Sequence, residues 1–391
     1  MSGRIVLFGA TGYTGGRTAE VLVGRGVRPV LAGRDAARLV ALGERLGCPT
    51  ATADVTDVAS VSALVGPDDV LVTTVGPFAR LGGAALAAVV SAGATYLDST
   101  GEPPFVREVF ELQGPAAERS GARLLTAFGH DYVPGVLAGA LALREAGDRA
   151  ARVDVGYFLS GRGRWFSRGT VTSLIAIAGT PGYTLRHGTL RTENAGARLR
   201  TYEVDGRPRP GVSIGGVEQF ALPRLHPGLG TVDVHLGWFG AQGDGSRRSP
   251  AGRVGLSGVV HATSRLPAPP APLLAGLARL AGRLPRDPSA EALARCRSHV
   301  VAEVFDAYGT LLARTRLTAP DPYALTADLL AWGAARALAH GVTGVGALDP
   351  VGAFGLDALV EGAASAGLTT WDLRATRSAQ STSGTCSGNR P

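Results

Sequence analysis

Short apolar runs alternate with amphipathic segments along the first third of the chain. The apolar runs predict strands at 4–8, 28–32, 50–53, 70–75, 95–98 and 122–127. The segments between them predict helices at 13–25, 36–46, 58–65, 82–92 and 105–119. Apolar strands that alternate with helices are typical of a parallel sheet covered on both faces. The pattern therefore predicts an α/β fold with a doubly wound parallel sheet.

The pattern changes after Pro134, where strand signals are separated by turns instead of by helices. Strands are predicted at 153–159, 196–205, 212–221, 231–239, 299–305 and 310–318, and helices at 170–178, 271–284, 322–340 and 350–367. This mixture predicts a second α+β domain with a mixed sheet. Residues 375–391 are small and polar, and we expect them to form a disordered tail.

The first predicted strand runs into a glycine-rich turn, GATGYTG at 9–15. Gly9 allows a tight turn, Gly12 lets the backbone approach a pyrophosphate, and Gly15 lets helix and strand pack closely. The following helix would point its N-terminal N–H groups at the anion. The turn therefore indicates a dinucleotide site, although such a turn can also be purely structural.

The second strand ends on Gly33-Arg34 rather than on an acidic residue. An acid at this place accepts a hydrogen bond from the ribose 2′-hydroxyl of NAD, whereas an arginine holds the 2′-phosphate of NADP. Arg38, one turn later, could add a second contact. Asp35 leaves NAD open, unless it caps the next helix. We expect NADP(H).

Composition excludes several kinds of chemistry. All 39 basic residues are arginine, so Schiff-base lysines, P-loop lysines and Tyr-x-x-x-Lys dyads are absent. The three cysteines are far apart, which predicts no metal site and a reducing, cytoplasmic location. No apolar run reaches membrane-spanning length, and scattered arginines with 6% aromatic residues argue against nucleic acid as a partner. The Leu- and Arg-containing stretch 266–288 is either a core or lid helix or a membrane-surface helix.

Several motifs together resemble one family. They are GATGYTG (9–15), VLAGR (30–34), TTVGPFARLGG (73–83), AGATYLDSTGE (92–102), AFGHDYVPG (127–135) and GALDPVGAFGLDAL (346–359). The chain resembles the saccharopine-dehydrogenase-like NADP-binding oxidoreductases, which include trans-acting enoyl reductases. The resemblance implies a Rossmann domain at 1–134 completed by 341–374, and a substrate and oligomerisation domain at 135–340. Many relatives have Phe where this chain has His130.

The resemblance also assigns positions to the cofactor. The residues that should hold the pyrophosphate are Gly9, Thr11, Gly12, Tyr13, Thr14 and Gly15. Arg34 should meet the 2′-phosphate and Asp54 the adenine. The nicotinamide side should be bordered by Thr74, Gly76, Pro77, Phe78 and Asp98.

Hydride transfer also needs a proton donor near the reacting carbon. The candidates are Tyr132, His130 and Tyr157, each of which could instead be a packing residue. Asp131 is expected to bond to backbone. The substrate-side candidates are Glu102, Trp165, Ser167, Arg168 and Thr170, of which Glu102 could simply cap a helix.

The sequence thus predicts an NADPH-dependent reductase of a C=C bond in a free or carrier-bound acyl substrate. An imine reductase or amine dehydrogenase of saccharopine-reductase type is the alternative within enzymes. A non-catalytic NADP-binding scaffold or sensor is the alternative outside them. No metal is expected, and a homodimer is compatible with the prediction.

Overall fold

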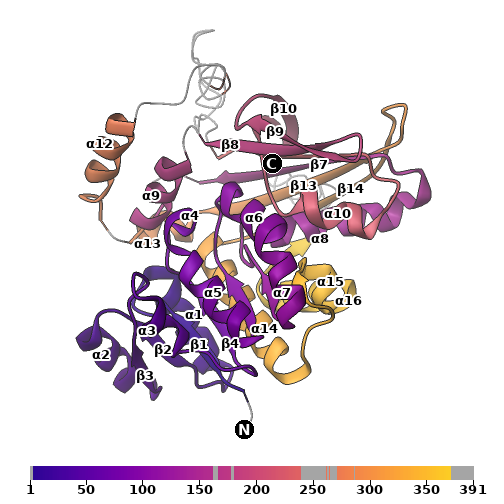
Figure 1. Cartoon of the computed structure of the whole chain (residues 1–391). Helices are drawn as coiled ribbons and strands as arrows, with labels where there is room; N and C mark the ends of the chain where they lie inside the picture. The colour runs from indigo at the N-terminus through magenta and orange to yellow at the C-terminus, as the bar shows by residue number, and fades with distance from the viewer. Residues whose placement is uncertain are drawn as a thin grey trace, which may run out of the picture.

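The computed structural model describes residues 3–161, 166–177, 180–238, 261, 264, 271–285 and 287–370. Trp165 and the expected tail 375–391 lie outside the described residues. The elements form two layers in Figure 1, with the N-terminal sheet and its helices below and a second sheet above. Among the described helices, none is both long and apolar enough to span a bilayer.

The first sheet has seven strands in the order β3-β2-β1-β4-β5-β6-β15, and all neighbours are parallel. The strands are β1 (Ile5–Phe8), β2 (Val30–Gly33), β3 (Thr50–Thr52), β4 (Val70–Thr73), β5 (Thr95–Asp98), β6 (Arg123–Leu125) and β15 (Gly346–Ala347). The helices among them are α1 (Tyr13–Gly24), α2 (Ala36–Leu46), α3 (Val58–Ser62), α4 (Phe78–Leu81), α5 (Gly83–Ala92), α6 (Pro103–Glu108) and α7 (Gly114–Ser120). The strand order reverses between β1 and β4, because β2 and β3 are added on one side of β1 and the later strands on the other. Doubly wound sheets bind ligands at this place. The predicted Rossmann-type fold is confirmed.

The second sheet is mixed, with the order β10-β11-β12-β7-β13-β14-β16 and the hairpin β8–β9 attached to β12. Its strands are β7 (Arg152–Ser160), β8 (Pro181–Arg186), β9 (Thr189–Asn194), β10 (Leu199–Val204), β11 (Arg207–Ile214), β12 (Thr231–Leu236), β13 (Arg297–Phe305), β14 (Leu311–Ala319) and β16 (Thr369–Thr370). Helix α8 (Val133–Ala146) leads from the first sheet and packs on β7, β13 and β14. The predicted second α+β domain with a mixed sheet is confirmed.

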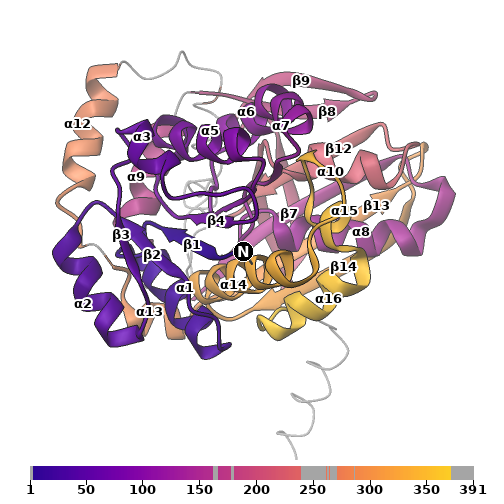
Figure 2. The same cartoon turned by 60° about the horizontal axis from the view of Figure 1, so that its bottom comes forward.

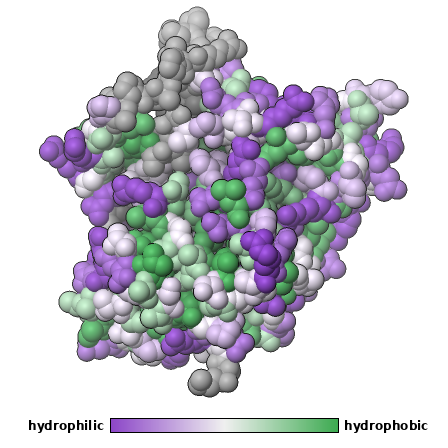
Figure 3. Space-filling model, viewed as in Figure 1, coloured by the Kyte–Doolittle hydropathy of each residue, from purple (hydrophilic) through white to green (hydrophobic). Residues whose placement is uncertain are grey.

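The remaining described helices are α9 (Arg168–Ile177), α10 (Glu218–Leu225), α12 (Ala271–Ala281), α13 (Ala290–Ala294), α14 (Pro322–His340), α15 (Pro350–Phe354) and α16 (Leu356–Ser365). Helix α12 stands at one side of the molecule beside α9. In the same view the surface around α5 is mainly apolar, whereas hydrophilic residues dominate around the second sheet (Figure 3).

Two local predictions were wrong, and one hairpin was missed. The strand expected at 212–221 ends at Ile214, and a helix begins at Glu218. The single helix expected at 350–367 is two helices, because Gly355 has φ 81° between them. The hairpin β8–β9 was missed, although His187-Gly188 joins its strands with positive φ at both residues, as tight hairpin turns require.

Two elements pack with a different domain from the one to which the sequence assigned them. Helix α14, inside the range expected for the substrate domain, packs along α1 and against β4 and β5 (Figure 2). Strand β16, inside the range expected to complete the Rossmann domain, pairs with β14 of the second sheet. We propose that the C-terminal return to the nucleotide-binding layer begins with α14 and ends before β16.

Candidate functional site

The glycine-rich turn lies where β1 and β4 separate the two halves of the parallel sheet. Gly9 has φ 90°, and its N–H donates to the carbonyl of Ala32 at 2.9 Å. A Cβ on Gly15 would lie 2.2 Å from the Gly9 carbonyl oxygen and 2.8 Å from Thr74 Oγ1. Side chains at Gly9 and Gly15 would therefore fill the space through which helix and turn approach each other. The turn has the shape that a dinucleotide pyrophosphate needs.

Helix α1 begins directly at this turn. Gly12 is its N-cap and provides no side-chain cap, so the first N–H groups have no capping partner from that residue. Two neighbours fix the side chain of Tyr13. Arg17 of the same helix donates to its hydroxyl at 2.7 Å, and the Tyr323 ring packs edge-on against it with ring centroids 5.2 Å apart. Thr14 lies in the same first turn, and its carbonyl accepts from Thr18. The first turn of α1 itself contains no acidic residue, which suits an anion site.

The end of β2 carries the residues expected to choose the cofactor. Arg34 is exposed there. Asp35 caps α2 by accepting from the Arg38 N–H at 3.1 Å, which is the capping role considered for it. The Arg38 side chain donates to the Thr11 carbonyl at 3.0 Å and so reaches back to the glycine-rich turn. Two basic side chains therefore border this side of the turn.

Asp54, expected near the adenine, follows β3. Its carboxylate accepts from both the N–H and the hydroxyl of Thr56, and these hydrogen bonds hold the pKa of Asp54 below its ordinary value. The charge of Arg34 acts in the same direction. Asp54 therefore stays ionised and shapes the loop after β3 beside Arg34.

The end of β4 carries Thr74, Gly76, Pro77 and Phe78, which were expected at the nicotinamide side. Glu102 binds this segment, since its two carboxylate oxygens accept from the N–H groups of Phe78 and Ala79, both at 2.9 Å. Glu102 is the N-cap residue of α6, as considered for it, but its carboxylate binds the first N–H groups of α4 instead of those of α6. Ser173 of α9 donates to the same carboxylate at 2.7 Å. Glu102 therefore connects the segments that follow β4 and β5 with α9.

Asp98 ends β5 in the interior and is fully buried. Its carboxylate accepts from the N–H groups of Thr100 and Ala127 at 2.8 and 2.9 Å and from the Thr126 hydroxyl at 2.7 Å. Burial raises the pKa of Asp98 to about 6 despite these bonds. The structure thus uses Asp98 to connect the ends of β5 and β6, and its side chain faces protein.

The three expected proton donors meet beyond β6. Tyr157 of β7 lies 6.3 Å, ring to ring, from both His130 and Tyr132. Each polar group already has a protein partner: the Tyr132 hydroxyl donates to the Gly215 carbonyl at 3.1 Å, and the Tyr157 hydroxyl donates to Glu218 at 2.5 Å. Burial raises the pKa of both phenols well above the ordinary value. These groups are positioned as interior partners rather than as exposed acids.

Asp131 is the partly exposed titratable group of this cluster, with a side chain 32% accessible. A Cβ on Gly101 would lie 2.4 Å from its Oδ2 atom, so the carboxylate rests against the end of β5. His130 Nδ1 lies 3.2 Å from the other oxygen. Because the carboxyl ends of β4, β5 and β6 share one edge, Asp131 lies on the same edge as Thr74 and Gly76.

The expected substrate segment covers part of this edge. Ser167 and Thr170 meet at 3.0 Å at the start of α9, and the Tyr323 hydroxyl lies 2.8 Å from the Thr170 hydroxyl and accepts from the Ser167 N–H. Tyr323 also contacts Tyr13, so it joins the substrate segment to the glycine-rich turn. Arg168 points away from these groups and donates to the Gly282 carbonyl near the end of α12.

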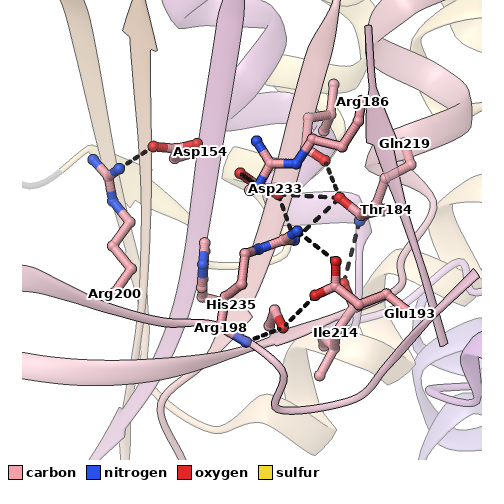
Figure 4. A network of polar contacts seen from close by, with 12 residues as sticks. Asp154, Thr184, Arg186, Glu193, Arg198, Arg200, Ile214, Gln219, Asp233 and His235 are labelled. Carbon is pink, nitrogen blue, oxygen red and sulfur yellow. Dashed lines mark hydrogen bonds and ion pairs between the residues drawn. The ribbon is translucent and has the colours of Figure 1, made fainter. Parts of the chain in front are cut away.

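Many arginines of the second sheet are engaged within it (Figure 4). Arg198 and Arg186 pair with Asp233 at 2.6 and 2.8 Å. Arg200 pairs with the buried Asp154 and with Glu303. This network lies on the sheet face opposite to the one that α8 covers, since Asp154 alternates with Val153 and Val155 of the core. The charges of these three arginines are therefore balanced by carboxylates of the same sheet.

Sequence reasoning missed Glu218 and Tyr323 and gave Asp131 only a backbone role. Asp131 stood in the quoted AFGHDYVPG motif at a strand end, and that position was its signal. Tyr323 follows Asp321-Pro322, a helix start in which Asp321 caps α14. Glu218 lay in a segment expected to be a strand, so no local pattern marked it.

Known proteins that are similar to this chain carry the names of oxidoreductases. No family model matches the chain. A protein of Mycobacterium tuberculosis that provisionally carries the name trans-acting enoyl reductase is 39% identical over 186 residues, which are 45% of this chain and 44% of that protein. Trans-acting enoyl reductase of Mycobacterium ulcerans is 39% identical over 137 residues, a third of each chain. The chain thus spans less than half the length of these curated relatives.

One solved structure covers almost the whole chain. Apo saccharopine dehydrogenase (L-Glu forming) from Saccharomyces cerevisiae matches with a TM-score of 0.56 over 95% of this chain and 100% of that one, at 14% identity. At this identity the likeness concerns the fold. The resemblance expected from the motifs is confirmed: the chain is a homologue of proteins named trans-acting enoyl reductases and has the fold of saccharopine dehydrogenase.

Proposed function

We propose that this protein is an NADP-dependent oxidoreductase that reduces the C=C bond of an enoyl thioester or a similar lipid-like or polyketide-like substrate. One observation carries the proposal. The glycine-rich turn, the segment Thr74–Phe78 and the accessible carboxylate of Asp131 lie at one edge of a single parallel sheet. The relatives named trans-acting enoyl reductases favour the C=C bond as the target.

The choice of NADP rests on the end of β2. Arg34 and Arg38 are basic, and Asp35 between them uses one carboxylate oxygen to cap α2. A guanidinium holds a phosphate through charge-assisted hydrogen bonds. Arg34 would meet the 2′-phosphate while Arg38 supports the turn that carries the pyrophosphate.

NADPH, when bound, supplies a hydride to the β carbon of the enoyl group. The residues of this chain then have to deliver a proton to the α carbon. The enolate that forms on the thioester oxygen must be stabilised, and its α carbon must be protonated. Asp131 would take up a proton from solvent at its accessible carboxylate, pass it to the α carbon and return to the carboxylate form, while Glu102 fixes the segment 78–79 and α9 beside it. Ser167, Thr170 and Tyr323 would border the acyl group.

The first alternative is imine reduction, or its reverse, which the fold of saccharopine dehydrogenase favours. A protonated iminium accepts hydride directly and depends less on a proton donor. The second alternative is a non-catalytic NADP-binding scaffold or sensor, which would need the turn but not Asp131.

The testing experiment has two stages. Fluorescence titration with NADPH and with NADH measures cofactor choice, and NADPH consumption is then followed with crotonyl-CoA, with the same acyl group on an acyl carrier protein, and with a cyclic imine. Saturated thioester as the product supports the proposal, and the two thioesters distinguish a free from a carrier-bound substrate. Formation of amine alone supports the imine alternative. Binding of NADPH without any turnover supports the scaffold, and binding of neither nucleotide overturns all three.

A further inference from the structure

His130 connects the two sheets at the edge where Asp131 lies. Its Nδ1 atom is 3.2 Å from Asp131 Oδ1, and its Nε2 atom is 2.6 Å from the hydroxyl of Ser298 on β13. The His130 side chain is 5% accessible and Ser298 is 2% accessible, whereas Asp131 is 32% accessible. The order of burial therefore runs from the interior serine, through the histidine, to the outward carboxylate.

This order excludes a hydrolase-like use of the three residues. In such a triad the hydroxyl must reach the substrate and the carboxylate is buried. Here the hydroxyl is buried and the carboxylate reaches outward. Both ring nitrogens of His130 are also engaged, so the ring has no free atom for a substrate.

The hydrogen-bond chemistry assigns the protons. Because a carboxylate oxygen accepts hydrogen bonds, the 3.2 Å contact assigns to Nδ1 of His130 the hydrogen that faces Asp131. Nε2 then has a lone pair, and the Ser298 hydroxyl donates to it. The backbone N–H of His130 also donates to the hydroxyl of Thr326 on α14 at 3.0 Å, which fixes the backbone at this position. The rings of Tyr157 and Trp238, at 6.3 and 5.9 Å, border the imidazole.

We propose that His130 and Ser298 form a positioning relay that orients the carboxylate of Asp131 toward the open sheet edge. His130 and Ser298 are positioning residues, because they act through Asp131. The relay rests on the proposed function for its catalytic consequence but not for its geometry. Because Ser298 belongs to the second sheet, the relay also couples the relative position of the two sheets to Asp131.

A structural test needs no substrate. In protein labelled with ¹³C and ¹⁵N at histidine, the ring of neutral His130, assigned with the His130→Asn variant, should show the Nδ1–H tautomer. Ser298→Ala should shift the His130 ring signals and leave those of His340, at the exposed end of α14, in place. A neutral Nε2–H tautomer, or His130 ring signals with the same chemical shifts in Ser298→Ala as in the wild type, would overturn the relay.

A kinetic test then measures its consequence with NADPH and crotonyl-CoA. His130→Asn keeps an N–H donor near the Nδ1 position, whereas His130→Phe removes it. We expect kcat to fall about tenfold or more in His130→Phe with unchanged NADPH affinity, and to recover largely in His130→Asn. Equal kcat in both variants would refute the positioning role. If wild-type protein turns over neither thioester nor imine, the proposed function fails, while the tautomer measurement still decides the relay.

Discussion

The phenol of Tyr157 donates a 2.5 Å hydrogen bond to Oε1 of Glu218 where β7, α8 and α10 meet. Glu218 is fully buried, and its other oxygen has no hydrogen-bond partner in the described structure. Gly135 of α8 makes room for the pair, since a Cβ there would lie 2.0 Å from the Tyr157 oxygen. Burial raises the pKa of Glu218 to about 8, so this carboxyl is largely protonated at neutral pH.

Glu218 therefore makes stability depend on pH. Its folded pKa of about 8 exceeds the ordinary value of 4.5, so the folded protein holds the proton more tightly than the unfolded chain. Its contribution is fully present below pH 4.5 and is lost as pH rises through about 8, by about 1.4 kcal/mol per pH unit. Glu218→Gln, which cannot ionise, should flatten this dependence in urea unfolding between about pH 5 and pH 8, where the folded and unfolded states differ in bound protons. The exposed Glu44→Gln is the control, and an unchanged slope in Glu218→Gln would contradict the assignment.

Two glycines of α1 offer a matched pair of substitutions. Gly15→Ala should distort the turn, because its Cβ would meet the Gly9 carbonyl oxygen at 2.2 Å. Gly24→Ala, at the other end of the helix, meets nothing within 4 Å and should be neutral or slightly stabilising. We expect NADPH affinity to fall strongly in Gly15→Ala alone, as measured by fluorescence titration. Equal affinity in the two variants would show that the close packing is not needed for binding.

Arg34→Asp tests the cofactor preference. Loss of a charge-assisted contact and repulsion of the 2′-phosphate should weaken NADPH by about tenfold to a hundredfold and leave NADH little changed. The control is Arg28→Asp, an exposed arginine before the same strand, which alters net charge equally. If both nucleotides weaken to the same degree, Arg34 does not recognise the phosphate.

Asp131→Asn should separate binding from catalysis. The amide keeps the size of the side chain but cannot transfer a proton, so turnover of crotonyl-CoA should fall by about a hundredfold or more while NADPH binding is retained. The highly exposed Asp357→Asn serves as the control. Full activity in Asp131→Asn would show that Asp131 is not the proton donor and would leave Tyr132 and Tyr157 as the candidates.

The location of the protein, a homodimer and the disordered tail stay predictions from the sequence. So does the substrate-side role of Trp165. The strongest predictions elsewhere concern segments whose local pattern is unambiguous. Helix α14 was predicted with the bounds that the structure has, and β1, β2 and β5 lie within one or two residues of their predicted ends.

The sequence by itself determined the parallel sheet, the glycine-rich turn and the basic end of β2. These depend on periodicity, on glycines at a turn and on the residue that follows a strand, all of which are local. Only the tertiary structure decided which polar groups face the open edge. Burial of Tyr157 beside Glu218, and of His130 beside Ser298, depends on contacts between residues 61 and 168 positions apart. Local patterns carry no information about such pairs, because the packing of the two sheets, and not the neighbouring residues, determines which side chains keep access to water.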